Sequence, residues 1–174
     1  AVVKRLMQGH RTTSLPETGA EYKIRFMLRK NVCEIMLDTT GDGLHKRGYR
    51  RNAMEAPIRE TLAATIADLG RVRRDSLVED PFCGSGTLLI EAAQKAMNIA
   101  PGLKRRFAAE RYSFVPAALW AEQRQKALAE SKLDVGFEAF GYDIDPAAVA
   151  QANVNAKLAG VENRCHFEVA DVAT

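Results

Sequence analysis

The sequence predicts an α/β fold organised around a parallel sheet, because three apolar segments each run into an acidic residue. The first segment, at residues 76–80, passes through Gly84 and Gly86 into an apolar helical stretch over 87–97. The second ends at Asp143 and leads into another helix, and the third ends at Asp171. Strands that alternate with helices in this way are typical of parallel sheets covered by helices.

The turn at Gly84 and Gly86 is the most informative segment of the chain. Glycine lets the backbone turn sharply and approach a ligand with no Cβ in between. The start of the following helix adds free N–H groups and the positive end of the helix dipole. This geometry suits a nucleotide-like cofactor, although a Gly-x-Gly turn is equally common as a tight connection that binds nothing.

The segment around Asp143 adds a second strand end with an acid. Asp145 before Pro146 predicts an N-cap followed by proline at the first helical position, and Gly160 is placed to end that helix. Asp143 itself could accept both hydroxyls of a ribose. The dinucleotide fingerprint, however, requires a third glycine, where this chain has Leu89, and an acid about 20 residues further on. An NAD-dependent enzyme is therefore disfavoured.

The three strand ends should bring Asp80, Asp143 and Asp171 to one rim of the sheet, where open α/β sheets bind ligands. One carboxylate could take ribose hydroxyls and another could accept from an adenine amine, which fits an adenosine ligand with a cationic centre such as S-adenosylmethionine. The alternative is that these acids only cap helices and form turns, which is a common use of aspartate.

Several motifs carry a resemblance to a known family. The sequences DPFCGSGT (80–87), GYDIDP (141–146) and AD (170–171) resemble motifs I, II and III of class I S-adenosylmethionine-dependent methyltransferases. LHKRGYR (44–50) and APIRETLAA (56–64) resemble THUMP-containing RNA methylases more narrowly. NIAPG (98–102) extends the resemblance to bacterial members that methylate the exocyclic amine of a guanine in 23S ribosomal RNA.

The resemblance implies the N-terminal part of a Rossmann-like class I methyltransferase sheet with S-adenosylmethionine as cofactor. It implies cofactor contacts for Asp80, Pro81, Cys83, Gly84, Gly86, Asp143 and Asp171, and it places Pro57 and Glu60 on the methionine side. Cys83 is expected to act as a small buried side chain and not as a nucleophile.

The Asn/Asp-Pro-Pro-aromatic motif with which such enzymes grip the amine does not occur in the chain. No catalytic residue is therefore assigned within it. We expect that motif beyond Thr174, and we expect the polypeptide to be an internal fragment that is inactive by itself.

Composition is that of an ordinary globular protein: 174 residues, 47% hydrophobic and 27% charged, with a net charge of +3. The three cysteines are scattered, so neither a disulfide framework nor a metal site is expected. The sequence shows no signal peptide and no apolar run long enough to span a bilayer, which predicts a cytoplasmic protein.

Two clusters combine basic and aromatic side chains, as RNA-binding surfaces do. The first comprises Lys46, Arg47, Arg50 and Arg51 around Tyr49, and the second comprises Lys104, Arg105, Arg106 and Arg111 with Phe107 and Tyr112. Lys46, Arg47, Tyr49 and Arg50 are the predicted RNA contacts. Solvated basic faces explain both clusters equally well.

The chain is predicted to divide near Gly43. Alternating apolar residues over 22–28 and 33–37 predict a β-hairpin, and the resemblance makes residues 1–43 the end of a THUMP RNA-binding module, with the methyltransferase part over 44–174. Helices are expected over 2–7, 53–69 and 116–132, the last with Trp120 in the core.

The strand that ends at Asp80 is expected to lie bare along one edge, which would favour self-association of the chain. Two other functions remain open. One is a DNA methyltransferase acting on the amine of adenine, and the other is a non-catalytic module that binds a nucleotide or RNA.

Overall fold

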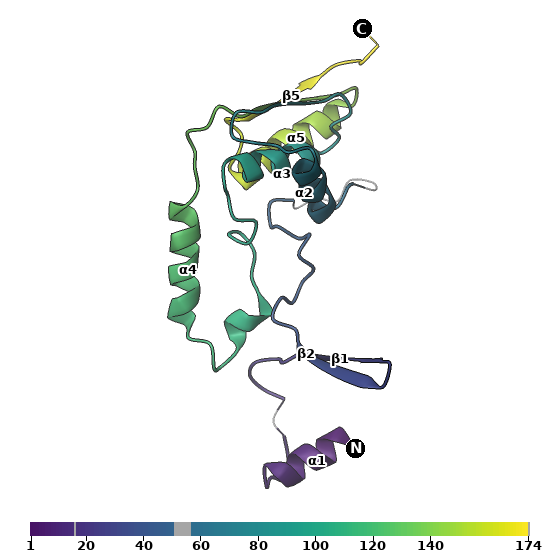
Figure 1. The fold of residues 1–174 in the computed structure, drawn as a ribbon, viewed down its shortest axis with the longest axis vertical. Helices are drawn as coiled ribbons and strands as arrows, with labels where there is room; N and C mark the ends of the chain where they lie inside the picture. Colours follow the sequence, from purple (N-terminus) through teal and green to yellow (C-terminus); the bar gives the residue numbers. More distant parts are fainter. Residues whose placement is uncertain (16, 51–56, 174) are drawn as a thin grey trace.

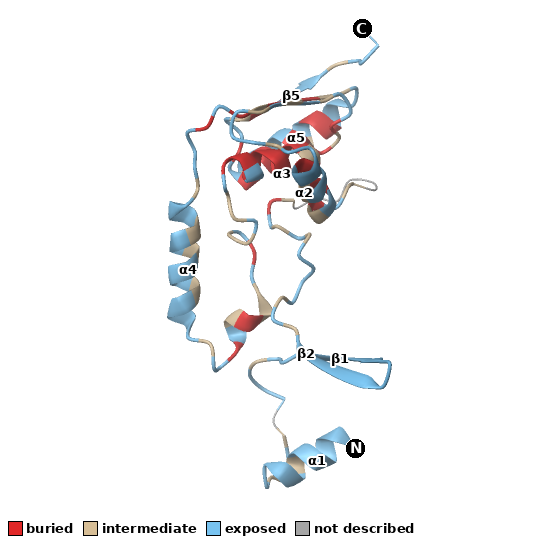
Figure 2. Ribbon diagram, in the orientation of Figure 1, coloured by how far each residue is buried: buried red, intermediate tan, exposed pale blue. Residues whose placement is uncertain are grey.

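The computed structural model describes residues 1–15, 17–50 and 57–173. The molecule is elongated, with the N-terminal helix and a hairpin at one end and a sheet with its helices at the other (Figure 1). Buried residues gather around the sheet and its helices, whereas the N-terminal helix and the hairpin are exposed (Figure 2). The two ends of the chain therefore differ in kind, and only the sheet end has a substantial core.

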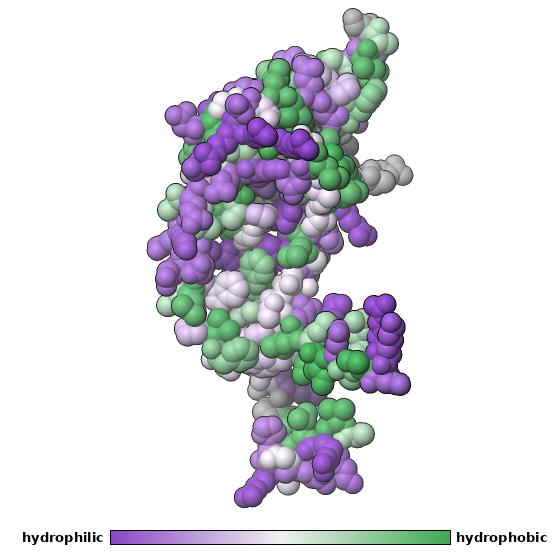
Figure 3. Space-filling model, viewed as in Figure 1, coloured by the Kyte–Doolittle hydropathy of each residue, from purple (hydrophilic) through white to green (hydrophobic). Residues whose placement is uncertain are grey.

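The N-terminal part contains α1 (Val2–Gly9), β1 (Ile24–Arg29) and β2 (Val32–Leu37). The two strands pair antiparallel from Ile24↔Leu37 to Arg29↔Val32. Lys30 and Asn31 between them both have positive φ, at 48° and 61°, which is the conformation of a two-residue hairpin turn. The predicted hairpin is confirmed. One of its faces carries the apolar pairs Ile24/Leu37, Phe26/Ile35 and Leu28/Cys33, and apolar side chains are visible over it in Figure 3.

The C-terminal part contains α2 (Glu60–Leu69), β3 (Leu77–Asp80), α3 (Thr87–Ala96), β4 (Glu138–Asp143), α5 (Pro146–Ala159) and β5 (Cys165–Val169). Within the described residues the three strands form a parallel sheet in the order β3-β4-β5. This confirms the predicted α/β class. It also leaves β3 at the edge of the sheet, as the sequence predicts.

Small side chains let the helices approach the sheet closely. Helix α3 buries Leu89 and Ile90 together with Ala92, Ala93 and Ala96, and α5 buries Ala148, Ala152, Ala156 and Ala159. Phe137 and Phe167 fill the space between these helices and the strands. Burial of this apolar surface supplies the main stabilisation of the C-terminal part.

Two further elements join α3 to β4: a 3-10 helix, η1 (Ala108–Arg111), and α4 (Ala117–Ala129). The predicted helix over 116–132 is confirmed in the shorter form of α4, which stands beside the rest of the molecule in Figure 1 and has no buried residue. Trp120 is only partly buried and stacks on Phe107 with ring centroids 5.5 Å apart. The prediction that Trp120 lies in the core is therefore corrected to a contact between α4 and the segment before η1.

The helix predicted from residue 53 begins at Glu60, since Arg59 is extended with φ −70° and ψ 139° and serves as its N-cap. Residues 53–56 of that prediction lie outside the described residues. Among the helices that the structure describes, none is long and apolar enough to cross a membrane.

Candidate cofactor-binding site

The loop between β3 and α3 folds back on itself through two glycines. Gly84 has φ +52° and Gly86 has φ +77°, both in the left-handed region that disfavours other residues. The Gly86 amide donates to the Cys83 carbonyl at 2.8 Å, and the Cys83 amide donates to the Tyr142 carbonyl at 2.8 Å. The loop is thereby attached to β4, and it leads directly into the first turn of α3, whose N–H groups have no intrahelical partner.

The two glycines have different surroundings. A Cβ on Gly84 would meet no atom within 4 Å, whereas a Cβ on Gly86 would lie 2.7 Å from the Phe167 ring and 3.0 Å from the Ala152 Cβ. The loop is thus packed tightly at Gly86, against β5 and α5, and open at Gly84. A ligand can approach only the open side.

Asp143 lies beside this loop and fixes its shape. One carboxylate oxygen accepts from the Gly84 amide at 2.9 Å and the other from the Asp145 amide at 2.9 Å. Asp145 in turn accepts from the Ala147 amide at 2.8 Å, which confirms the predicted N-cap of α5 with Pro146 in the first turn and Gly160 at its end. Each oxygen of Asp143 retains a lone pair, so the carboxylate can still receive hydroxyl donors from a ligand.

The other two acids lie at the ends of the neighbouring strands: Asp80 is the last residue of β3, and Asp171 comes two residues after β5. Asp80 accepts from the Phe82 amide at 3.1 Å, and Asp171 accepts from the Ala173 amide at 2.9 Å. Because the strands are parallel, Asp80, Asp143 and Asp171 all lie at or just after carboxyl ends at the same edge of the sheet. The structure therefore brings together the predicted acids, and it also gives each one a contact with a backbone amide of its own turn.

Cys83 is buried in the loop, whereas Pro81 is exposed beside it. Burial raises the pKa of the Cys83 thiol to about 12, and the negative charges of Asp143 and Asp80 act in the same direction. The side chain is consequently a neutral thiol at physiological pH. This agrees with its expected role as a small buried side chain.

Glu60 belongs to a buried ion pair at the start of α2. It is 2% exposed, and the Arg50 guanidinium donates to it at 3.2 Å. Arg50 also donates to the Ile58 carbonyl at 3.2 Å and lies 3.5 Å from the Thr87 hydroxyl, the first residue of α3. Pro57 is partly buried in the same segment. Through Arg50, the segment 57–60 is connected to α3, the helix that follows the glycine loop.

Of the four predicted RNA contacts, Lys46, Arg47, Tyr49 and Arg50, the last three have partners within the chain. Tyr49 is 1% exposed and donates its hydroxyl to Glu91 at 3.0 Å, so its ring cannot stack on a base in this structure. Arg47 pairs with the same Glu91 at 3.3 Å, and Arg50 is occupied by Glu60. These side chains attach residues 38–50 of the linker between β2 and α2 to α3 and α2. Only Lys46, which faces Asp42 at 3.4 Å, is freely exposed, and Arg51 lies outside the described residues.

The second basic cluster likewise contains both buried and exposed side chains. Arg105 is 7% exposed and its guanidinium donates to the carbonyls of Thr40, Asp42, Gly43 and Lys46. Tyr112 is buried, while Arg106 and Arg111 are exposed. Arg105 therefore acts as the joint between the linker and the segment before η1.

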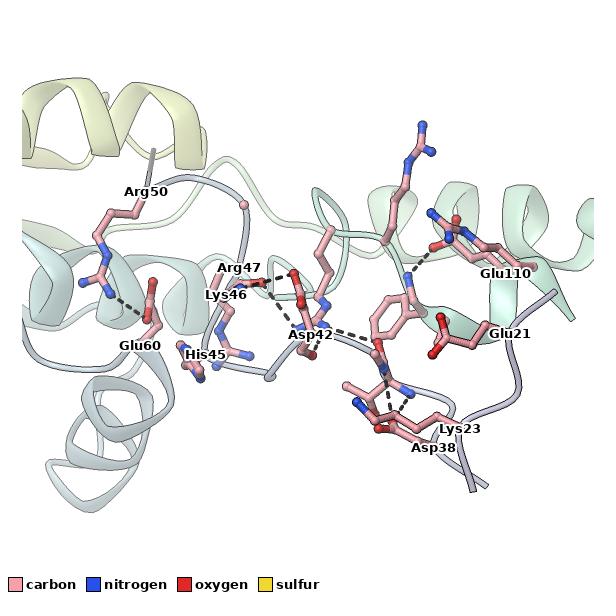
Figure 4. Close-up of a pocket in the computed structure, with 18 residues that line it drawn as sticks. Glu21, Lys23, Asp38, Asp42, His45, Lys46, Arg47, Arg50, Glu60 and Glu110 are labelled. Atoms are coloured by element: carbon pink, nitrogen blue, oxygen red, sulfur yellow. Dashed lines mark hydrogen bonds and ion pairs between the residues drawn. The ribbon is translucent and has the colours of Figure 1, made fainter. Parts of the chain in front are cut away.

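A groove of about 980 Å³ lies between these parts (Figure 4). Most residues of 38–50 and of 105–111 line it, together with Glu60 at the start of α2 and with Glu21 and Lys23 from the segment before β1. None of the glycine-loop residues from 80 to 87 lines the groove, but Arg50 and Glu60, which connect the start of α2 to α3, do line it (Figure 4). Among the described residues, Lys23, Arg106 and Arg111 of this lining form no ion pair.

Sequence reasoning did not single out Asn155, which is fully buried in α5 and donates to the Ser85 carbonyl of the glycine loop at 3.0 Å. A signal was present in the sequence. Asn155 follows Ala148 and Ala152 at helical spacing, so it is a polar residue on the apolar face of its helix.

Comparison with known proteins identifies relatives that are similar in sequence over most of this chain. A protein of Bacillus subtilis (strain 168) named "Putative RNA methyltransferase YpsC" is 42% identical over 164 residues, which are 94% of this chain and 43% of that protein. The ribosomal RNA large subunit methyltransferase K/L of Shewanella baltica (strain OS185) is 43% identical over 166 residues, 92% of this chain and 23% of that protein. The chain thus spans less than half the length of either relative.

Solved structures agree with this fold. A crystal structure described as a predicted N6-adenine-specific DNA methylase from Listeria monocytogenes str. 4b F2365 superposes with a TM-score of 0.92 at 40% identity, over 99% of this chain and 46% of that one. The structure of SMU.472, a methyltransferase by name, complexed with SAH (S-adenosylhomocysteine), gives 0.87 at 40% identity, over 97% and 45%.

Residues 47–174 match the family model described as "RMKL-like, methyltransferase domain" (UPF0020). This range contains the glycine loop, the three strand-end acids and all of the parallel sheet. The chain belongs to the RMKL-like methyltransferase domain family.

Proposed function

We propose that this chain forms the S-adenosylmethionine-binding part of an RNA methyltransferase that methylates the exocyclic amine of a guanine in 23S ribosomal RNA. The observation that carries the proposal is the glycine loop, open at Gly84, held by Asp143 and followed directly by the N-terminus of α3. The RNA methyltransferase names of two relatives and the SAH complex of SMU.472 support it. Such a substrate implies a cytoplasmic protein.

The residues at the strand ends suit this cofactor. When bound, S-adenosylmethionine would supply a methyl group on a cationic sulfur. A positioned amine could attack the methyl carbon, so that the N–C bond forms as the C–S bond breaks, with S-adenosylhomocysteine as the leaving group and loss of a proton from the amine. The open side at Gly84 admits a ligand to backbone N–H groups, and the lone pairs left on Asp143 can accept ribose hydroxyls. Asp80, Asp171, Pro81 and Cys83 complete the edge around the loop, with Pro57 and Glu60 on the side of the methionine. Most of the rate acceleration would come from orienting the reactants and excluding water.

We further propose that the group that grips the target amine lies outside residues 1–174, because no Asn/Asp-Pro-Pro-aromatic sequence occurs here. Residues 1–174 alone should then bind the cofactor weakly or not at all and transfer no methyl group. Methylation of ribosomal RNA by this polypeptide alone would contradict that view.

The division of the chain supports an RNA substrate. We propose that residues 1–43 end a THUMP module and that the methyltransferase part begins at residue 44, close to the start of the family match at residue 47. The groove between the two parts offers Lys23, Arg106 and Arg111, cations that form no ion pair within the described residues. Such cations can neutralise RNA phosphates, and they replace Arg47, Tyr49 and Arg50 as the candidate contacts.

The test uses the full-length protein. Calorimetric titration with S-adenosylmethionine and SAH should show binding that Asp143→Ala weakens strongly, with Asp145→Ala as a control that removes a helix cap but not the contact to Gly84. Methylation of 23S ribosomal RNA from cells that lack the gene, followed by mass spectrometry of the nucleosides, identifies the modified base. A failure to bind either compound would overturn the proposal.

A DNA methyltransferase acting on adenine is the second candidate, since one structure of similar fold is described as a predicted N6-adenine-specific DNA methylase. Parallel assays on RNA and on duplex DNA, with mass spectrometry of both products, separate the two substrates. Cofactor binding without methylation of either would favour a non-catalytic binding module.

A further inference from the structure

The glycine loop has a support that lies away from its ligand-facing side. Asn155 is 0% exposed, and its Nδ2 donates to the Ser85 carbonyl at 3.0 Å. Its Oδ1 accepts from Gln151 Nε2, one turn earlier on α5, at 2.9 Å. Both ends of the buried amide are thus satisfied, and its orientation is set by the helix that bears it.

The same helix packs against the loop one turn before Asn155. Ala152 approaches so closely that a Cβ on Gly86 would lie 3.0 Å from the Ala152 Cβ. Helix α5 therefore touches the loop twice, through a methyl group at Gly86 and through a hydrogen bond at Ser85. These two adjacent contacts fix the distance between α5 and residues 85–86 of the loop, and they also fix the direction of the peptide group between Ser85 and Gly86.

Ser85 itself is held between further buried groups. It is 7% exposed, and its hydroxyl lies 3.2 Å from the Thr87 hydroxyl, which Arg50 approaches at 3.5 Å. The peptide that joins Ser85 to Gly86 carries the carbonyl held by Asn155 and the Gly86 N–H that donates to Cys83. Rotation of this peptide would therefore disturb the turn as a whole.

We infer that Asn155 is a positioning residue for the cofactor: by holding the Ser85 carbonyl it keeps the Cys83–Gly86 loop in the shape that receives S-adenosylmethionine. The inference rests on the proposed function. Asn155 is buried behind the loop, so it would act through Ser85 and would touch neither the cofactor nor the target base.

The test compares Asn155→Ala with Asn153→Ala in the full-length protein. Asn153 is a control of the same residue type on the same helix: it is exposed, and it donates to the Val149 carbonyl of that helix at 3.1 Å, with no bond to the loop. We expect the Kd for SAH to rise about five- to tenfold in Asn155→Ala, as expected for the removal of a neutral hydrogen bond, and to stay within about twofold in Asn153→Ala. The KM for S-adenosylmethionine should rise in parallel, with kcat at saturating cofactor nearly unchanged.

A purely structural role would lower the melting temperature without altering the Kd of the folded protein, and that result would overturn the inference. Should Asn155→Ala fail to fold, Gln151→Ala replaces it, since Gln151 is only partly buried and orients the Asn155 amide. A rise of about twofold in Kd is expected there, and an unchanged Kd would count against the inference. Absence of binding by the wild type would instead refute the proposed function itself, and the inference with it.

Discussion

At the scale of the residue, Gly84 and Gly86 share a left-handed backbone but differ in what lies beside them. Gly84 faces open space, and Gly86 faces Phe167 and Ala152. The Gly-x-Gly pattern predicts the turn. The difference in packing between the two glycines depends on Phe167 from β5 and Ala152 from α5.

Substitution of the two glycines should therefore have different outcomes. Gly86→Ala places a Cβ 2.7 Å from the Phe167 ring, so overpacking and backbone strain together should lower the free energy of unfolding by about 2–4 kcal/mol. Gly84→Ala meets no atom and should lower it by only about 1 kcal/mol through its positive φ, while weakening SAH binding at least tenfold. Urea denaturation and calorimetry of full-length variants check both. Equal loss of stability in the two variants would contradict the difference in packing.

Tyr49 offers a second test at this scale. Burial, followed by the negative charge of Glu91, raises the pKa of Tyr49, so the phenol stays protonated and donates to Glu91. Tyr49→Phe should lower the free energy of unfolding by about 1 kcal/mol at pH 7, with no change in RNA affinity. A loss of RNA affinity at unchanged stability would return Tyr49 to an RNA-binding role.

The same substitution carries a pH dependence of known sign. The Tyr49 hydrogen bond lowers the pKa of Glu91 against the larger effect of burial, which raises it. Without that bond the folded-state pKa of Glu91 rises further, and a carboxyl group with a raised folded pKa loses stability as pH rises through the window above its unfolded value. The deficit of Tyr49→Phe should therefore grow as pH rises through the folded-state pKa of Glu91, which burial holds above the ordinary value, and denaturation over a series of pH values would show it.

At the scale of the element, Arg105 determines how the linker meets the segment before η1. Its guanidinium donates to four carbonyls between Thr40 and Lys46, and Tyr112 donates to the carbonyl of Asp38 nearby. In the sequence Arg105 looks the same as its exposed neighbour Arg106. Only the tertiary contacts distinguish a structural arginine from a candidate RNA contact.

Arg105→Ala should weaken the attachment of residues 40–46, because it removes the donor of four partly buried hydrogen bonds. We expect a decrease of about 2–3 kcal/mol in the free energy of unfolding and faster hydrogen exchange in residues 38–46. Arg106→Ala is the control, and it should leave both quantities unchanged. Unaltered exchange in Arg105→Ala would show that other contacts hold the linker.

At the scale of the whole molecule, the groove and the sheet edge are the two surfaces on which we predict contacts with partners. The groove lies between the N-terminal part and the segment 105–111, and β3 is one of the two outer strands of the described sheet. Leu77 at the start of β3 is 67% exposed. Each surface supports a separate prediction.

For the groove, replacing Lys23, Arg106 and Arg111 together by alanine should weaken RNA binding and make it less dependent on salt, because the slope against salt falls by about one for each phosphate that is no longer neutralised. Cofactor affinity should stay unchanged, because the substitutions leave intact the glycine loop, which does not line the groove, and the Arg50–Glu60 pair, which does. Binding isotherms at several salt concentrations provide the measurement. An unchanged slope would place the RNA elsewhere.

For the edge strand, residues 1–174 should self-associate with rising concentration, because unpaired backbone groups on an edge strand can pair with another chain. Light scattering across concentrations measures this, and Leu77→Lys should reduce it by adding a charge to the edge. A monodisperse monomer at all concentrations would refute this prediction.

The sequence alone determined the local structure of this protein: the glycine turn, the Asp145 cap, the hairpin and the three strands that end in acids. These features are predictable because turns, caps and periodic patterns depend on residues close together in the chain. The contacts of Tyr49, Arg105 and Asn155 were decided by the tertiary structure, because Glu91, the carbonyls of 40–46 and Ser85 lie 42 to 70 residues away. Polar residue types in a sequence do not reveal whether such distant partners bury them, and so only the folded chain separates binding residues from those that hold the site in place.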